Sequence, residues 1–182
     1  MRINEPLISF YHAIMRPEWT RLERPGQAPA VWGDAQPRFD SAVLGPHFEE
    51  LCRDWAARFA EDVILGGRAV GAASAVVNDR ARRRTWEVDV VVRAVDGRLL
   101  ALGEATWGKV MGADDLDRLR RIRDLLVAQD RSGADSARLL CFGAAGFTEE
   151  LRAAERAGQV ACIGPEHLYG FAASTTGSVG AP

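Results

Sequence analysis

The sequence is almost devoid of lysine, because Lys109 is the only lysine among its 23 basic Lys and Arg residues. Cysteine and histidine are also scarce, with three of each, widely spaced and without a C-x-x-C pair. These spacings argue against a zinc motif and give no disulfide framework. We therefore expect reduced core cysteines at Cys52, Cys141 and Cys162.

Strong net charge and long apolar runs are missing as well. The net charge is −2, which provides no overall attraction to nucleic acid or to a membrane. No apolar run approaches the ~20 residues of a membrane span, and the first residues do not open a signal peptide. We therefore expect a cytoplasmic protein without a membrane partner, in which any DNA binding comes from a local patch.

The hydrophobic pattern predicts an α/β fold with a mixed central sheet flanked by helices. Segment 1–45 is expected to hold a helix at 5–15 and a long irregular connection, packing on the core. The main domain is expected at 46–171 and a disordered tail at 172–182. Within the domain we expect helices at 46–60, 114–129 and 148–158, and strands at 70–77, 85–92, 98–107, 137–143 and 159–164.

Two of these strands are joined by Asp96-Gly97, which is a strong signal for a tight hairpin. With a two-residue turn, Asp89 lies directly opposite Glu104, and Glu87 lies opposite Thr106 on the same face. Like charges in such positions destabilise a sheet, and a hard divalent cation bound by their oxygens would relieve the repulsion. The alternative is that these carboxylates lie at a wet sheet edge or pair with nearby arginines.

The segment "GEATWGKV" comes within one residue of a phosphate-binding loop. The Ser or Thr that would hold Mg²⁺ in such a loop is Val110 here. The preceding strand also belongs to a hairpin, and Trp107 is bulky for a phosphate cradle. We therefore expect no nucleotide site in this chain.

The pattern E-x-D in one strand and G-E-x-x-W at the end of the next resembles the PD-(D/E)XK nuclease superfamily. The expected order of elements matches its restriction-endonuclease-like core (αβββαβ). The similarity is closer still to the domain of unknown function at the C-terminus of archaeal-type ATPases, through Ile3–Phe10, Leu44–Arg53, Glu87–Val91 and Leu102–Trp107. The resemblance implies an ATPase module in the natural protein or its operon.

The resemblance also implies a metal site for Mg²⁺ or Mn²⁺. Asp89 and Glu104 would be ligands, with the Ala105 carbonyl as a third and Glu49 acting through water. Glu87, from the same acidic cluster, is a further candidate ligand. Such an ion would activate water for hydrolysis of a DNA phosphodiester.

The lysine of the family motif is replaced by Thr106, which cannot supply a positive charge. Lys109 is the nearest substitute, but strand parity points it to the opposite face unless Gly108 bends the strand end. Three hypotheses remain: an active nuclease that uses Thr106 and Lys109, a catalytically degenerate nuclease fold serving as a nucleic-acid- or protein-binding regulatory module, and a protein-interaction domain.

Two arginine-rich segments are candidate contacts for DNA phosphates. The first precedes the first strand of the hairpin and consists of Arg80, Arg82, Arg83 and Arg84. A solvated loop is the alternative for this segment. The second lies on the helix at 114–129, where interleaved acids favour an ordinary salt-bridged face.

Overall fold

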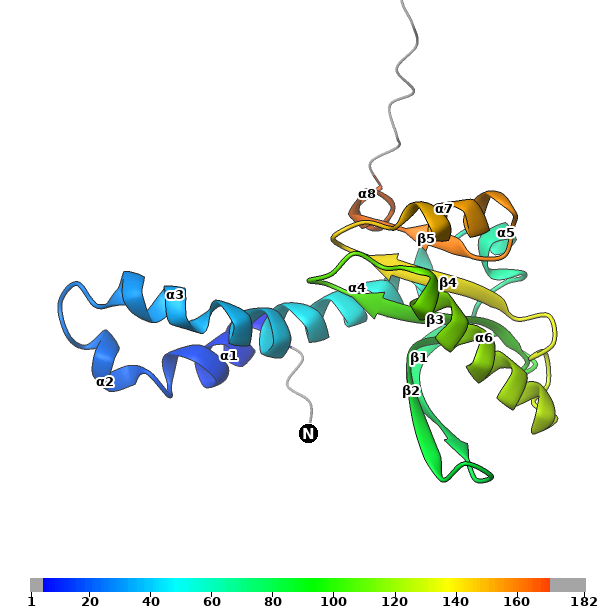
Figure 1. Ribbon diagram of the computed structural model, residues 1–182, viewed down its shortest axis with the longest axis horizontal. Helices are drawn as coiled ribbons and strands as arrows, with labels where there is room; N and C mark the ends of the chain where they lie inside the picture. Colours follow the sequence, from blue (N-terminus) through cyan, green and yellow to red (C-terminus); the bar gives the residue numbers. More distant parts are fainter. Residues whose placement is uncertain (1–4, 171–182) are drawn as a thin grey trace, which may run out of the picture.

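The computed structural model describes residues 5–170, so the expected disordered tail at 172–182 lies outside the described residues. A five-stranded mixed sheet of order β1-β2-β3-β4-β5 forms its centre (Figure 1). The β1-β2 and β2-β3 pairs are antiparallel, and the β3-β4 and β4-β5 pairs are parallel. The strands are β1 (Gly71–Asp79), β2 (Arg84–Arg93), β3 (Leu99–Thr106), β4 (Arg138–Gly143) and β5 (Ala161–Ile163).

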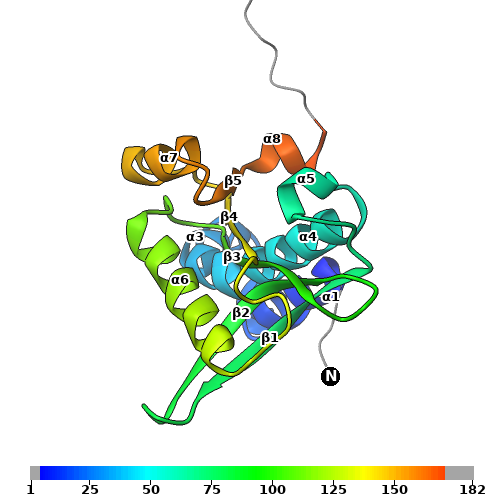
Figure 2. The same cartoon turned by 90° about the vertical axis from the view of Figure 1, so that its right-hand side faces the viewer.

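Helices cover both faces of this sheet, which confirms the expected fold class (Figure 2). On one face, α6 (Ala113–Ala128) and α7 (Glu149–Arg156) bury an apolar stripe that includes Leu119 and Ile122 against Val91 and Leu102. On the other face, α4 (Gly45–Arg58) packs against the sheet, with α5 (Asp62–Leu65) and α8 (Pro165–Leu168) beside it. All three cysteines are buried with free thiols in these two cores, as expected.

The expectation of an irregular connection before residue 46 is wrong. This stretch forms α2 (Trp19–Leu22), α3 (Ala28–Phe39) and a π-helical turn, η2 (Asp40–Leu44), that leads directly into α4. Two of its prolines, which suggested a loop, occupy first-turn helix positions, where the missing N–H costs nothing: Pro29 and Pro46.

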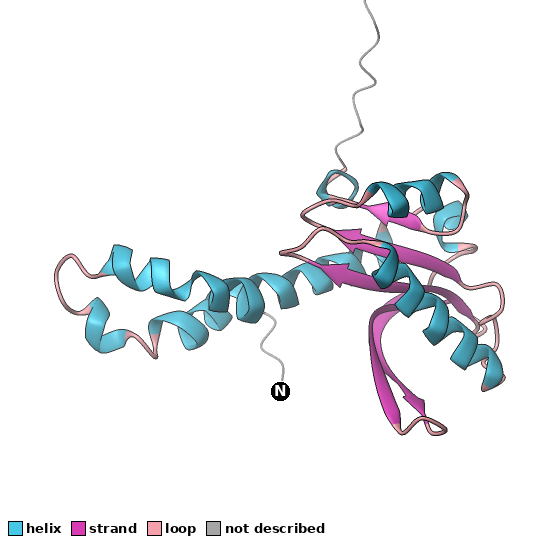
Figure 3. Cartoon of the chain, viewed as in Figure 1, coloured by secondary structure: helices cyan, strands magenta, loops and turns pink. Residues whose placement is uncertain are grey.

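The N-terminal helices form an arm that extends away from the sheet, so the expected packing on the core is also wrong (Figure 3). The arm begins with α1 (Pro6–Phe10) and a second π-helical turn, η1 (Tyr11–Met15). Aromatic rings hold it together: the Phe39 ring lies 5.7 Å from that of Phe10 and 5.1 Å from that of Trp32. Its stability therefore comes from packing within the arm.

The β1-β2 hairpin is a ribbon that bends away from the rest of the sheet (Figure 1). Between Val88 and Val91, strand β2 has one residue more than its partner β1, which is a β-bulge. Because of the bulge, these two valines pack in the same core although they are three residues apart. The bulge therefore changes the strict alternation of side chains expected along β2.

The β2-β3 hairpin has the predicted register where it matters for the acidic residues, with Val90 opposite Gly103. The two-residue turn is wrong in detail, because the register shifts next to Val92 and the Ala94 N–H donates to the Arg98 carbonyl at 3.0 Å.

No helix among residues 5–170 has the length and apolar character needed to span a bilayer.

Candidate functional site

Asp89 and Glu104 come together where β2 and β3 separate. The regular pairing of the two strands ends at Val90 and Gly103, so these acids are the next residues on each strand. Asp89 Oδ2 accepts a 2.9 Å hydrogen bond from the Ala105 backbone N–H, which ties its side chain to β3. The site therefore contains two acid side chains from neighbouring strands.

Gly103 allows the strand to carry Glu104 at this position. A Cβ atom at Gly103 would lie 2.9 Å from Phe142 Cε2 and 3.1 Å from Val90 Cβ. The first distance is shorter than real Cβ contacts and the second is tighter than most of them, so the close packing beneath the site favours glycine. The Phe142 ring in turn packs edge-on against Trp55 of α4, with ring centroids 5.9 Å apart.

Both acids lie in a poorly solvated environment. Burial, followed by the nearby charge of Asp89, raises the pKa of Glu104 to about 7. Burial also raises the pKa of Asp89, although the hydrogen bond from Ala105 and the charge of Arg118 oppose the shift. Two half-buried acids with raised pKa values thus lie side by side in this site.

Arg118 of α6 is the residue that the sequence reasoning missed. Its guanidinium forms an ion pair with Glu104 and donates a 2.6 Å hydrogen bond to the Glu87 backbone carbonyl. Glu104 Oε2 is buried, and the arginine lies against it without the geometry of a hydrogen bond. No local sequence pattern marks this role, because the contact of Arg118 with Glu104 depends on how α6 packs on the sheet.

The expected pairing of Glu87 with Thr106 is absent from the described strand pairs. β2 leaves β3 after Val90, the Glu87 side chain is exposed, and Thr106 pairs with Gly143 of β4. Glu87 thus contributes its backbone carbonyl to Arg118, as described above. Thr106 remains the last residue of β3.

Glu49 reaches the site region from α4, on the face of the sheet opposite α6. Its carboxylate lies 3.6 Å from the Arg53 guanidinium, which donates a 3.1 Å hydrogen bond to the Asp89 carbonyl. Across residues 5–170, no group of three or more His, Cys, Asp or Glu side chains is placed to hold a metal. The four expected ligands are thus not gathered into one cluster.

Lys109 lies in the loop after β3 and is exposed. Its Nζ is 3.0 Å from Asp115 Oδ1, and Asp115 Oδ2 accepts a 3.0 Å hydrogen bond from the Gly112 N–H at the start of α6. Lys109 lowers the pKa of Glu104, but as the smallest of five influences. The lysine therefore supports a helix start and influences the acids only weakly.

The four arginines of the first basic segment lie at the tip of the β1-β2 ribbon, where all are exposed. Arg82 bonds to the buried Asp79, at 3.0 Å through its backbone N–H and 3.2 Å through its guanidinium. Arg84 stacks over the Trp86 ring at 3.9 Å. Arg80 and Arg83 complete the set. Five residues of strand, roughly 17 Å at ~3.3 Å each, separate the tip from the acids.

A scan against protein-family models, a search of curated proteins and a search of solved structures each found no match to this chain. We therefore infer the function from the residues of the site and their contacts.

Proposed function

We propose that this chain is a divalent-metal-dependent nuclease-fold domain that acts on DNA. The observation that carries the proposal is the meeting of Asp89 and Glu104 where the pairing of β2 with β3 ends, both with raised pKa values. Perturbed acids of this kind cluster at functional sites. The order α4-α5-β1-β2-β3-α6-β4, in which the short α5 is an addition, supports the restriction-endonuclease-like core that the motifs imply.

The donor set fits Mg²⁺ or Mn²⁺, because both side chains offer only oxygen atoms. The buried Glu104 Oε2 pairs with Arg118 without a hydrogen bond, so a bound ion would share this oxygen with the arginine. Asp89 and Glu104 would hold the ion. When bound, such an ion lowers the pKa of water and stabilises charge on a phosphate.

The chain's own residues position and charge this site. The Ala105 N–H fixes the Asp89 carboxylate, and Arg53 holds the Asp89 backbone from the opposite face. Arg118 supplies the positive charge that Thr106 lacks. A guanidinium binds anions well but does not release a proton near neutral pH, so Arg118 would hold charge and would not act as a base.

The exposed ribbon tip is the proposed contact for DNA phosphates. A distance of roughly 17 Å corresponds to about five phosphates along one strand of duplex DNA. The arginines would thus engage the backbone several nucleotides away from the acids. An ATPase module remains the partner that the sequence motifs imply.

A second candidate is a catalytically degenerate module that binds DNA without cutting it. It is favoured by the ion pair of Arg118 with Glu104, together with the threonine at position 106. In that case the arginine is the permanent counter-ion of the acids. The domain would then serve a regulatory role beside the ATPase.

A cleavage assay with Mg²⁺ or Mn²⁺ on single- and double-stranded DNA separates the two candidates. The nuclease proposal expects cleavage that requires the metal and is lost in Asp89→Asn. Its matched control is Asp114→Asn, an exposed acid at the start of α6. DNA binding without cleavage by the wild type, together with cleavage created by Thr106→Lys, supports the degenerate module. Absence of both binding and cleavage contradicts both candidates.

A further inference from the structure

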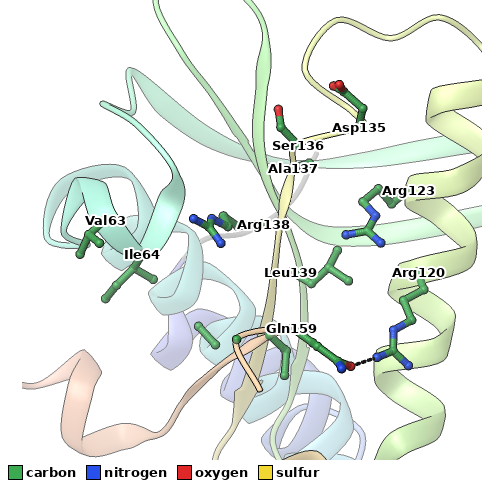
Figure 4. Close-up of a pocket in the computed structure, with 13 residues that line it drawn as sticks. Val63, Ile64, Arg120, Arg123, Asp135, Ser136, Ala137, Arg138, Leu139 and Gln159 are labelled. Carbon is green, nitrogen blue, oxygen red and sulfur yellow. Dashed lines mark hydrogen bonds between the residues drawn. The ribbon is translucent and has the colours of Figure 1, made fainter. Parts of the chain in front are cut away.

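A separate pocket of about 710 Å³ lies at the other end of the parallel strands. It is bounded by α5, α6 and the first residues of β4 and β5 (Figure 4). Arg138, at its edge, pairs with Ala101, whereas Glu104 pairs with Cys141, three residues or about 10 Å further along β4. The volume falls within the ~300–1,000 Å³ typical of small-molecule sites.

The pocket exists because β4 begins before β5. The parallel pairing of these strands starts at Leu140 opposite Ala161, so the first two residues of β4 precede the ladder on that side. Leu139 packs into the core on the α6 face. Alternation sends Arg138 to the other side of the strand, toward α5 (Figure 4).

The lining is strongly basic. Arg120 and Arg123 come from α6 and Arg138 from β4, whereas Asp135 is the one carboxylate of the lining, which leaves an excess of two positive charges. The Arg120 guanidinium donates a 2.8 Å hydrogen bond to Asp117 Oδ1 and a second hydrogen bond to Gln159 Oε1.

The other two arginines have no such partner. Neither Arg123 nor Arg138 makes an ion pair or a hydrogen bond with another described residue, and they flank opposite sides of the β4 strand (Figure 4). Guanidinium groups recognise phosphate with paired, charge-assisted hydrogen bonds. Arg138, which points toward α5 and its aliphatic residues, is therefore suited to hold a phosphate group in this pocket.

The wall on the side of Arg138 is aliphatic and includes Val63 and Ile64 of α5 (Figure 4). No aromatic side chain lines the pocket, so it offers no surface on which a nucleobase would stack. We propose that this pocket binds a phosphate monoester with a short aliphatic body, with Arg138 on the phosphate and the aliphatic residues of α5 on the body. This ligand site goes beyond the proposed nuclease function and shares no residue with it.

Calorimetric titration with hexyl phosphate tests the proposal, with inorganic phosphate and hexanoate as comparisons. We expect one site per chain that prefers hexyl phosphate to both. Arg138→Gln should weaken binding at least about tenfold, as expected for the loss of a charge-assisted hydrogen bond, whereas Arg123→Gln, on the other side of β4, should weaken it less. Arg121→Gln is the matched control, because Arg121 lies on α6 outside the pocket lining.

A second variant tests the aliphatic wall. Val63→Ser should lower the affinity for hexyl phosphate and leave the affinity for inorganic phosphate unchanged, because only the ester contacts this wall. Val63 is 73% exposed, so the substitution should not affect folding. The proposal is overturned by non-saturable binding of hexyl phosphate, by equal losses in Arg121→Gln and Arg138→Gln, or by hexanoate binding as tightly as hexyl phosphate.

Discussion

The guanidinium of Arg118 lies against the carboxylate of Glu104, and the Glu87 backbone carbonyl holds the same guanidinium at 2.6 Å. This interaction joins α6 to the point where β2 and β3 separate. The Arg118 guanidinium is therefore a counter-ion for Asp89 and Glu104 that the protein itself supplies. In the proposed account, a divalent ion and Arg118 share the Glu104 carboxylate, so changing one should change the other.

Replacing Arg118 with glutamine should strengthen divalent-ion binding. The substitution removes a positive charge beside the proposed site, and we expect affinity for Mg²⁺ to rise about tenfold, or ~1.4 kcal/mol. Calorimetry at pH 8.5 keeps Glu104 ionised during the measurement. Arg121→Gln, on the same helix, should leave the affinity unchanged, and equal affinities for wild type and Arg118→Gln would contradict the shared-carboxylate account.

The raised pKa of Glu104 predicts a loss of stability as the pH rises. Below about pH 4.3, the ordinary glutamate pKa, the group is protonated in both the folded and the unfolded chain and has no effect. Between that value and the folded pKa of about 7 the unfolded chain loses the proton first, so the free energy of unfolding falls. Well above pH 7 the free energy of unfolding is lowered by the full amount.

Glu104→Gln removes this titration. We expect the variant to be more stable than wild type by about 2 kcal/mol at pH 8, after allowing for the removal of the carboxylate that pairs with Arg118. The two proteins should converge near pH 4. Urea denaturation in EDTA measures the difference. Glu87→Gln, an exposed acid nearby, should show no such pH dependence, and a constant offset for Glu104→Gln at both pH values would refute the assignment.

Gly103→Ala should destabilise the fold by about 1–3 kcal/mol, because the added methyl group overpacks against Phe142 and Val90. Gly108→Ala is the matched control, since nothing lies within 4 Å of a Cβ there. Thermal melts of the two variants provide the comparison. Equal melting temperatures would show that the strand accommodates a side chain beneath the site.

The ribbon tip should control the affinity for DNA and its dependence on salt. Each DNA phosphate that the protein no longer neutralises lowers the slope of log affinity against log salt by about 0.9. The double variant Arg80→Gln/Arg83→Gln should therefore reduce the slope by up to about two. Arg58→Gln, on α4, is the control. An unchanged slope in the double variant would place the DNA-binding surface elsewhere.

The sequence predicted the strands and the site register well, because turn chemistry and alternation are local signals. Asp96-Gly97 marked the hairpin, and Val90 does lie opposite Gly103. The bulge in β2 was not predictable, because the extra residue between Val88 and Val91 has no Gly or Pro to mark it. That bulge and the bend of the ribbon separate Glu87 from Thr106.

The N-terminal arm and Arg118 were missed for different reasons. Prolines in 17–46 suggested a loop, but Pro29 and Pro46 begin helices and aromatic packing holds the arm. Arg118 belongs to the helix for which the sequence favoured an ordinary salt-bridged face, because sequence alone does not show where α6 crosses β3. Only the packing of α6 on the sheet brings its guanidinium to Glu104.

Titration of the full chain with Mn²⁺ at pH 8 tests the central claim most directly. If Asp89 and Glu104 hold the ion, the wild type should bind one Mn²⁺ per chain with saturation at millimolar concentration or below. Asp89→Asn should abolish that binding, whereas Asp114→Asn should preserve it. Absence of saturable binding in both wild type and Arg118→Gln, or undiminished binding in Asp89→Asn, would contradict the account.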